Sequence, residues 1–346
     1  MTTSDIKIGI VGAGENTRSR HIPGFQKISD VEIVGVVNRS RESSQRVANE
    51  FGIANTYAHW QEAIDDSATN AIMIGTWPYL HCPVTVAALE AGKHVLCEAR
   101  MAMNAREAHK MFEASQKHPQ LTAQIVPAPM SLHVDGTVQR LLREDYLGRV
   151  LVAEVRQSSG FLDANSPLHW RQNTDLNGLN IMSMGIWYEI VMRWLGHSVE
   201  VQAMGQTFIK TRNNENGNPR AARVPEHIDV LAKMECGAQL HLQISAACGL
   251  GQGNGVWLFG EAGTLYFDGK KLWGARRDES QLREIETPAE ENSEWRVEAE
   301  FVNAIRGLEE VKLTDFRTGV KGMEFTEAVS RSVAEKRSVA LPLRVL

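Results

Sequence analysis

The sequence has few cysteines, no clustered basic residues and no long apolar segment. Its four cysteines include no C-x-x-C pair, and no histidine stands at metal-ligand spacing from them, so we expect free thiols, no disulfide and no metal site. The formal net charge is −5, and without a basic run the chain is not expected to bind nucleic acid. Because no stretch of about 18 uncharged apolar residues occurs, we expect no membrane span.

What is present is typical of a large globular protein. At 346 residues, of which 43% are hydrophobic and 23% are charged, the chain is long enough for two domains that each bury a core. The N-terminal segment lacks the basic region, apolar core and cleavage site of a secretory signal, so we expect a cytoplasmic location. The composition favours a small-molecule ligand.

The first third of the chain alternates strand-like and helix-like segments. Buried parallel strands are predicted by apolar runs at 6–11, 31–37, 71–76, 94–97 and 121–126. A helix with an irregular start, or with a break near Pro23 and Gly24, is predicted at 15–28. The pattern predicts a doubly wound Rossmann domain over residues 1–126, and prolines at 127 and 129 then end it.

Beyond residue 126 apolar and polar residues alternate, as in antiparallel strands with one exposed face. Such strands are predicted at 149–157, 227–236, 238–248 and 255–269, and helices at 135–145, 178–195 and 294–306. Residues 127–346 are therefore predicted to form a second α/β domain.

The segment GAGENT, residues 12–17, follows a predicted strand and opens a predicted helix, which is the context of a dinucleotide-binding loop. Gly12 and Gly14 would let the backbone approach a pyrophosphate, with Asn16 and Thr17 beside it. Thr17 stands where the third glycine is usual. An ordinary strand-to-helix turn is the alternative.

The second strand ends in Asn38, Arg39 and Ser40, where an aspartate or glutamate usually binds the adenosine ribose. No carboxylate stands there to repel a 2′-phosphate, and Arg39 and Ser40 could bind one. We therefore predict NADP as the cofactor, with NAD as the alternative. A solvent-exposed turn is the plain alternative for Arg39.

Four segments together carry a family resemblance: GAGENT, VVNRS, TWPYLHCPVTVAALEAGKHVLCEA and WRQNTDLNGLNIMSMGIWYEIVMRWLG. From about residue 5 to the C-terminus the chain resembles the Gfo/Idh/MocA oxidoreductases. The resemblance implies a nicotinamide cofactor and a C-terminal α/β domain for substrate binding and oligomerisation. That domain would have a large, mostly antiparallel open sheet, on which a homodimer or homotetramer forms. Substrates would be sugars, polyols or their carbonyl forms, and Thr76, Trp77, His81 and Glu98 would contact the cofactor.

The chain departs from this family at its catalytic positions. The usual Glu-Lys-Pro reads Glu98-Ala99-Arg100, and Ser183 and Trp187 replace the usual aspartate and histidine. Arg100 is predicted to stabilise charge rather than to act as a base, because a guanidinium does not give up its proton. Glu98 would contact the nicotinamide ribose, orient Arg100, or form a structural salt bridge.

Within the predicted helix at 178–195, Asn180, Ser183 and Trp187 share a face. The resemblance implies that this face lines the substrate pocket, so these residues would bind the substrate together with Arg171. His169 and Tyr188 are the predicted proton carriers, and a loop histidine and a core tyrosine are their plain alternatives. The other histidines, including His21, His94 and His241, are expected to be structural.

Three functions stay open. The favoured one is an NAD(P)-dependent oxidoreductase with a non-standard proton relay, which acts on a sugar-like or other small carbonyl or alcohol. The second is a redox-neutral enzyme that cleaves glycosides or isomerises sugars with a recycled nicotinamide. The third is a non-catalytic protein that senses the cofactor.

Overall fold

The computed structural model describes residues 5–251 and 253–344, and these residues form two compact units. The first unit extends to Pro127 and also contains Arg296–Val320. The second unit covers Ala128–Trp295 and resumes at Lys321. The predicted second domain was continuous, whereas in the structure this segment near the C-terminus belongs to the first unit.

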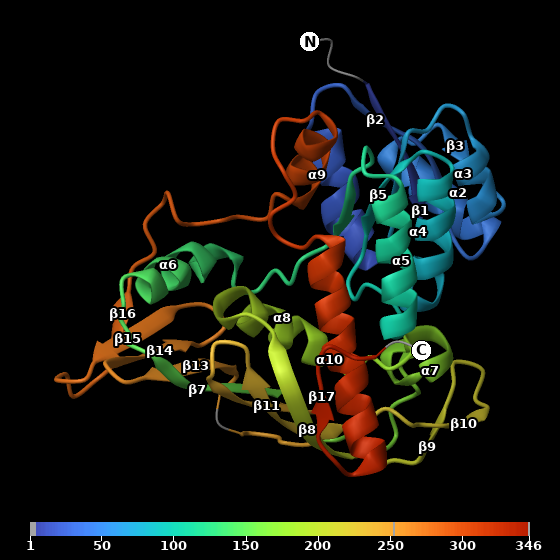
Figure 1. Cartoon of the computed structure of the whole chain (residues 1–346). Helices are drawn as coiled ribbons and strands as arrows, with labels where there is room; N and C mark the ends of the chain where they lie inside the picture. Colours follow the sequence, from blue (N-terminus) through green and yellow to red (C-terminus); the bar gives the residue numbers. More distant parts are fainter. Residues whose placement is uncertain (1–4, 252, 345–346) are drawn as a thin grey trace. The chain divides into compact units, whose positions relative to one another are not determined.

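In the first unit, the described residues form a six-stranded sheet whose paired strands are all parallel, in the order β3-β2-β1-β4-β5-β6 (Figure 1). The strands are β1 Ile6–Val11, β2 Val31–Val37, β3 Asn55–Thr56, β4 Ala71–Ile74, β5 His94–Cys97 and β6 Ala123–Ile125. Both faces of the central strands are covered, so their sequences are nearly unbroken apolar runs. The strand order reverses between β1 and β4, and ligands of such sheets bind at the carboxyl ends of the strands beside that reversal.

Helices connect these strands: α1 Ile22–Gln26, α2 Arg41–Phe51, α3 Trp60–Asp65, α4 His81–Glu90 and α5 Ala105–Lys117. The returning segment adds a further helix to this unit, α9 Val297–Ile305. The irregular start predicted for the first helix takes the form of a π-helical turn, η1 Thr17–His21. A short 3₁₀ turn, η2 Pro78–Leu80, precedes α4. The side chains of Ser40 and Asn104 accept backbone N–H groups at the starts of α2 and α5.

The second unit contains a nine-stranded sheet over the described residues, in the order β16-β15-β14-β13-β7-β12-β11-β8-β17. Its strands are β7 Val150–Ser158, β8 Ser198–Gln206, β11 His227–Met234, β12 Gln239–Ser245, β13 Gly255–Gly260, β14 Gly263–Phe267, β15 Leu272–Arg276, β16 Arg283–Ile285 and β17 Val339–Ala340. Neighbouring strands are antiparallel except for β12 and β7, which are parallel. The single strand predicted at 255–269 is a hairpin of β13 and β14.

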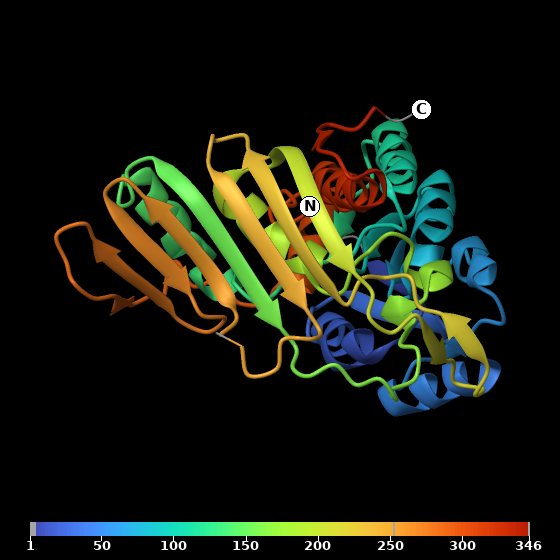
Figure 2. The same ribbon diagram turned by 90° about the horizontal axis from the view of Figure 1, so that it is seen from below.

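The remaining elements of this unit are α6 Leu132–Arg143, η3 Trp170–Gln172, α7 Thr174–Asn177, α8 Met184–Leu195 and the small hairpin of β9 Thr211–Asn213 and β10 Pro219–Ala221. A last helix, α10 Phe316–Glu335, begins in the first unit and ends in the second. Figure 2 shows α6 in green and α8 in yellow-green on one side of the large sheet. The predicted fold class, a Rossmann domain followed by an α/β domain with a mostly antiparallel sheet, is confirmed.

The side chains of the large sheet alternate as expected for a sheet that packs on one face. Ile228 and Val230 of β11 are buried, whereas the side chain of Leu231, on the opposite face of the strand, is 46% exposed. On the same open face, Trp257 of β13 stacks on Tyr266 of β14 with ring centroids 3.9 Å apart. Over the ranges described above, no helix combines the length and the apolar character that crossing a membrane requires.

Candidate functional site

Two glycines shape the loop that follows β1. Gly12 has φ +86°, and a Cβ there would lie only 2.8 Å from the backbone nitrogen of Thr76, so the turn requires glycine. A Cβ on Gly14 would lie 3.6 Å from the carbonyl oxygen of Gly75, an ordinary contact distance. Packing alone would therefore accept alanine at Gly14, and its bare backbone leaves room for a ligand to approach.

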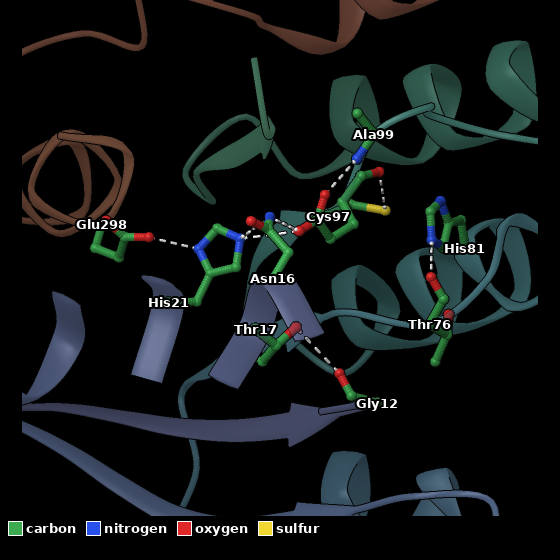
Figure 3. A network of polar contacts seen from close by, with 10 residues as sticks. Gly12, Asn16, Thr17, His21, Thr76, His81, Cys97, Ala99 and Glu298 are labelled. Atoms are coloured by element: carbon green, nitrogen blue, oxygen red, sulfur yellow. Dashed lines mark hydrogen bonds and ion pairs between the residues drawn. The ribbon is translucent and has the colours of Figure 1, made fainter. Parts of the chain in front are cut away.

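Thr17 closes this loop from the inside. Its side chain is buried and its hydroxyl donates to the carbonyl oxygen of Gly12 at 3.3 Å (Figure 3). A Cβ on Gly75 would lie 2.1 Å from that hydroxyl oxygen, so the packing of Thr17 depends on the glycine. The side chain of Thr17 therefore holds the loop, and the predicted contact of Thr17 with the cofactor stays a prediction.

The end of β2 is tied to the same loop. Asn38 accepts the N–H of Ala13 at 2.7 Å, and its amide nitrogen donates to the carbonyl oxygen of Ser43 at 3.3 Å. Asn38 therefore positions the loop against α2. Arg39 is exposed, and its guanidinium lies 5.5 Å from the centre of the Trp77 ring.

His81 joins the segments that follow β4 and β5. Its ring is fully buried, with Nδ1 and Nε2 each 2.9 Å from a carbonyl oxygen, that of Arg100 and that of Thr76. Burial lowers the pKa of His81, although its backbone partners act in the opposite direction. The ring of His81 therefore holds the segments after β4 and β5 together, and its predicted contact with the cofactor stays a prediction.

Glu98 is the carboxylate that follows β5, and three groups hold it. One oxygen accepts the side-chain amide of Asn16 and lies 3.1 Å from Nε2 of His21, and the other accepts the N–H of Ala99 at 3.0 Å. Burial alone would raise the pKa of Glu98, but the hydrogen bond and charge of His21, with the other donors, hold that pKa below its usual value. Glu98 is therefore a fixed, ionised acceptor at the carboxyl edge of the sheet.

Arg100 follows this glutamate after a cis peptide bond between Ala99 and Arg100. The residue is only 9% exposed, so its guanidinium charge is largely shielded from water. A charge in such surroundings acts more strongly on a nearby reacting group than a solvated one does.

Tyr188 lies in the core of the second unit. It is 1% exposed, its ring stacks on Phe325 with centroids 3.5 Å apart, and its hydroxyl accepts the N–H of Ser198 at 2.8 Å. Burial raises the pKa of Tyr188 to about 12. The structure contradicts the predicted catalytic role, since a sealed phenol that holds its proton this tightly has no route to a substrate.

The predicted substrate-binding face around residue 180 is also corrected. The helix begins at Met184, so Asn180 is not part of it; it is fully buried and donates to the carbonyl oxygen of Asn177 at 2.7 Å. Trp187 is in the helix but only 4% exposed, and it offers no stacking surface. Ser183 remains half-exposed, with its hydroxyl donating to Gln157 at 2.8 Å.

His169 and Arg171 flank the ring of Trp170 on an exposed turn. Arg171 lies 4.2 Å above that ring, and the imidazole of His169 packs beside it at 5.7 Å between centroids. Partial burial, followed by the charge of Arg171, lowers the pKa of His169. Its Nδ1 accepts the N–H of Arg171 at 3.3 Å, so the neutral ring carries its proton on Nε2.

Two family models match the chain: "Oxidoreductase family, NAD-binding Rossmann fold" over residues 6–125 and "GFO/IDH/MocA C-terminal domain" over residues 136–266. The chain belongs to the Gfo/Idh/MocA oxidoreductase family. This confirms the family that the four sequence segments indicated. The altered Glu-Ala-Arg segment is a feature of this Gfo/Idh/MocA member's own sequence.

Among curated relatives, the Gfo/Idh/MocA chain is 28% identical over 178 residues to oxidoreductase P35 of Formosa agariphila, covering 51% of this chain and 55% of that protein. It is 27% identical over 189 residues to levoglucosan dehydrogenase of Pseudarthrobacter phenanthrenivorans, covering 54% of this chain and 48% of that one. The chain thus spans about half the length of these relatives.

Solved structures match over nearly the whole chain. Levoglucosan dehydrogenase in complex with NADH and L-sorbose has a TM-score of 0.85 at 21% identity, covering 97% of this chain and 99% of that one. Aldose-aldose oxidoreductase from Caulobacter crescentus, complexed with glycerol, has a TM-score of 0.79 at 21% identity, with 97% and 100% covered. At this identity the likeness shows that the Gfo/Idh/MocA fold is shared.

Sequence reasoning missed His21 and Glu298. His21 was expected to be structural, and Glu298 lies 277 residues further along the chain, in the segment that returns to the first unit. In the structure, His21 contacts both Glu298 and Glu98. No local pattern in the sequence signals this pairing.

Proposed function

We propose that this family member is a nicotinamide-dependent oxidoreductase that transfers a hydride between the nicotinamide and an alcohol or carbonyl group of a sugar-derived substrate. The observation that carries the proposal is the edge of the first sheet. Gly14, where the fold has room for a Cβ but the sequence has none, follows one strand of this parallel sheet. The ionised carboxylate of Glu98 follows another.

The residues of this edge suit a nicotinamide dinucleotide. The first amide groups of a helix have no acceptor within the helix, and here they directly follow Gly14, where a pyrophosphate would be held. Glu98 can accept a ribose hydroxyl, and the guanidinium of Arg39 with the ring of Trp77 forms an aromatic and cationic pair after β2 and β4. When bound, the nicotinamide ring would supply the hydride acceptor or donor.

Names of relatives support a sugar-like substrate. Besides levoglucosan dehydrogenase, they include 1,5-anhydro-D-fructose reductase of Ensifer adhaerens, 33% identical over 109 residues, which cover 32% of each chain. Arg171 and Ser183 are the proposed substrate contacts, since both keep some exposure in the second unit.

The proton and charge would be managed by residues other than the usual lysine. As hydride leaves an alcohol carbon, the hydroxyl proton must be taken up and the developing negative charge stabilised. We propose Arg100 for the charge and His169 for the proton. In the reducing direction the imidazolium form of His169 would donate its Nε2 proton and become neutral; in the oxidising direction the neutral ring would accept a proton at Nε2. Both steps need a proton on Nδ1, so the hydrogen bond from the N–H of Arg171 to Nδ1 would have to open.

Arg39→Ala is expected to weaken NADPH binding by roughly tenfold or more and to leave NADH binding unchanged, because only NADPH carries a 2′-phosphate for the guanidinium. Arg39 is exposed at the end of β2, and Asn38-Arg39-Ser40 contains no carboxylate. Titration of each nucleotide by quenching of protein fluorescence would measure this. Arg46→Ala, later in α2 and also exposed, is the matched control. An unchanged NADPH to NADH ratio in Arg39→Ala would refute the preference for NADP.

We also propose that the protein forms a homodimer or homotetramer through the open face of the large sheet. Met204 of β8 is 78% exposed and Leu231 of β11 is 46% exposed on that face. Replacing both by glutamate is expected to give monomers in sedimentation velocity runs, because two apolar contacts become charged. A wild type that sediments as a monomer would contradict this proposal.

The function itself is tested with a panel of sugars, glycosides, polyols and aldehydes, each incubated with oxidised or reduced nucleotide. Absorbance at 340 nm follows the cofactor, and mass spectrometry follows each compound. Net cofactor conversion with one of them supports the proposed oxidoreductase. Product without net conversion would indicate a redox-neutral reaction on a recycled nicotinamide, and nucleotide binding without any product would indicate a sensing protein.

A further inference from the structure

A buried histidine lies between two carboxylates at the edge of the first sheet. His21 is fully buried, and its Nδ1 is 2.5 Å from a carboxylate oxygen of Glu298 (Figure 3). Its Nε2 is 3.1 Å from a carboxylate oxygen of Glu98. Glu298 is itself buried, whereas the side chain of Glu98 keeps 15% of its exposure. The row therefore extends from the interior to the carboxylate that the ligand would meet.

Glu298, His21 and Glu98, which form this row, come from three separate segments of the chain. His21 ends the π-helical turn η1, and such turns are frequent at functional sites. Gly24 leaves space for Glu298, since a Cβ there would lie 2.8 Å from the carboxyl group. Glu298 comes from α9, in the returning segment, so the row is not an accident of neighbouring residues in one helix.

The two contacts require a charged ring. A neutral imidazole has one N–H, so one of the two buried carboxylates would face a nitrogen lone pair; an imidazolium donates to both. Burial by itself would lower the pKa of His21, but the hydrogen bonds and charges of Glu298 and Glu98 more than offset it and raise that pKa to about 9. Glu298 and Glu98 are charged groups that face the ring, and Asn16, at 3.4 Å, is neutral.

We propose that His21 and Glu298 are positioning residues that hold Glu98 as an ionised, fixed acceptor for the nicotinamide ribose hydroxyls. The inference rests on the proposed function, because Glu98 needs a ribose to accept. Glu298 keeps His21 protonated, and protonated His21 keeps Glu98 charged and aimed. Once His21 loses its proton, Glu98 loses its strongest donor, so nucleotide affinity is expected to fall as the pH rises through about 9.

The first test uses the protein without nucleotide. In ¹⁵N-histidine NMR spectra of the full chain, the His21 ring is expected to show two protonated nitrogens at pH 7 and to lose one near pH 9. The His21→Gln spectrum identifies the resonances; should that variant not fold, Glu298→Gln identifies them, because it leaves the ring in place and shifts its titration. A neutral His21 ring at pH 7 would overturn the inference.

The second test measures NADH and NADPH affinity between pH 7 and pH 10. Glu298→Gln removes one charge at nearly constant size, so the alkaline fall in affinity is expected to move down by at least about one pH unit. His21→Gln should weaken binding roughly tenfold at pH 7, as expected for loss of a charged hydrogen bond, and should abolish the alkaline fall. His94→Gln, a histidine in β5 whose Nδ1 accepts the N–H of Thr122, is the matched control and should keep the wild-type profile.

The outcomes separate the two claims. A wild type that binds neither nucleotide would overturn the proposed function and this inference with it. A wild type that binds, and whose pH profile is unchanged by Glu298→Gln, would overturn this inference alone. A merely structural pair would change affinity or stability without moving the pH of the transition.

Discussion

Gly14→Ala is expected to leave the protein folded and to lower nucleotide affinity by at least about 100-fold, because a methyl group would stand where the backbone must approach a pyrophosphate. The new Cβ would meet the carbonyl oxygen of Gly75 at 3.6 Å, which the fold tolerates. Calorimetric titration with NADH and NADPH measures the affinity, and thermal unfolding measures the stability.

Two other glycines make this test specific. Gly12→Ala should lose both stability and binding, since its φ is +86° and its Cβ would collide with backbone atoms of the segment after β4. Gly52→Ala should cost about 1–2 kcal/mol in the free energy of unfolding, for a left-handed alanine, and leave binding unchanged. Gly52 has φ +68°, and no described neighbour would lie within 4 Å of a Cβ there. Wild-type affinity in Gly14→Ala would contradict the assignment of this loop to the nucleotide.

Arg100→Ala is expected to slow hydride transfer by roughly 100-fold to 1,000-fold, the usual effect of removing one group that stabilises developing charge. Nucleotide affinity should change little, because His81, Glu98 and the loop after β1 remain in place. Single-turnover measurement of the nicotinamide absorbance, with a substrate found in the panel, separates the hydride step from binding. Arg100→Lys should restore part of the rate, since it restores a cation.

The control for this experiment is Tyr188→Phe. It removes the hydroxyl that accepts the buried N–H of Ser198, so we expect a loss of about 1–3 kcal/mol in the free energy of unfolding. Its turnover should equal that of the wild type at temperatures where both are folded. Slow hydride transfer in Tyr188→Phe together with normal transfer in Arg100→Ala would reverse the two roles assigned above.

The strands of the first unit could be predicted because their signal is local. Runs such as IKIGIV and VEIVGVV are mostly apolar and rich in β-branched residues, which is typical of buried parallel strands. The glycines of the first loop could be predicted for the same reason, since a tight turn between strand and helix constrains a few adjacent residues.

The role of α8 could not be predicted in the same way. Its sequence, MGIWYEIVMRWL, is apolar on most sides, so periodicity does not tell which side chains enter the core and which face a ligand. Trp187 and Tyr188 both proved to be buried. Asn180 was misplaced because its hydrogen bond to Asn177, three residues earlier, closes a turn before the helix begins.

The contacts of His21 with Glu298 and Glu98 could not be predicted from the local sequence. Glu298 reaches His21 because Arg296–Val320 returns to the first unit, and the apolar pattern of that segment fits a helix in either unit. Contacts between residues so far apart in sequence depend on the assembled fold. The structure, not the motif, therefore reveals what holds Glu98.

The central claim is that hydride passes between a nicotinamide and a sugar-derived carbon. The most direct measurement is to incubate the protein with NADPH or NADH that carries deuterium at both C4 positions and a panel of keto and aldehyde sugars, and to analyse the products by mass spectrometry. We predict a carbon-bound deuterium in the alcohol formed from at least one compound. Tight binding of the labelled nucleotide, with no deuterium transferred to any compound, would contradict the account.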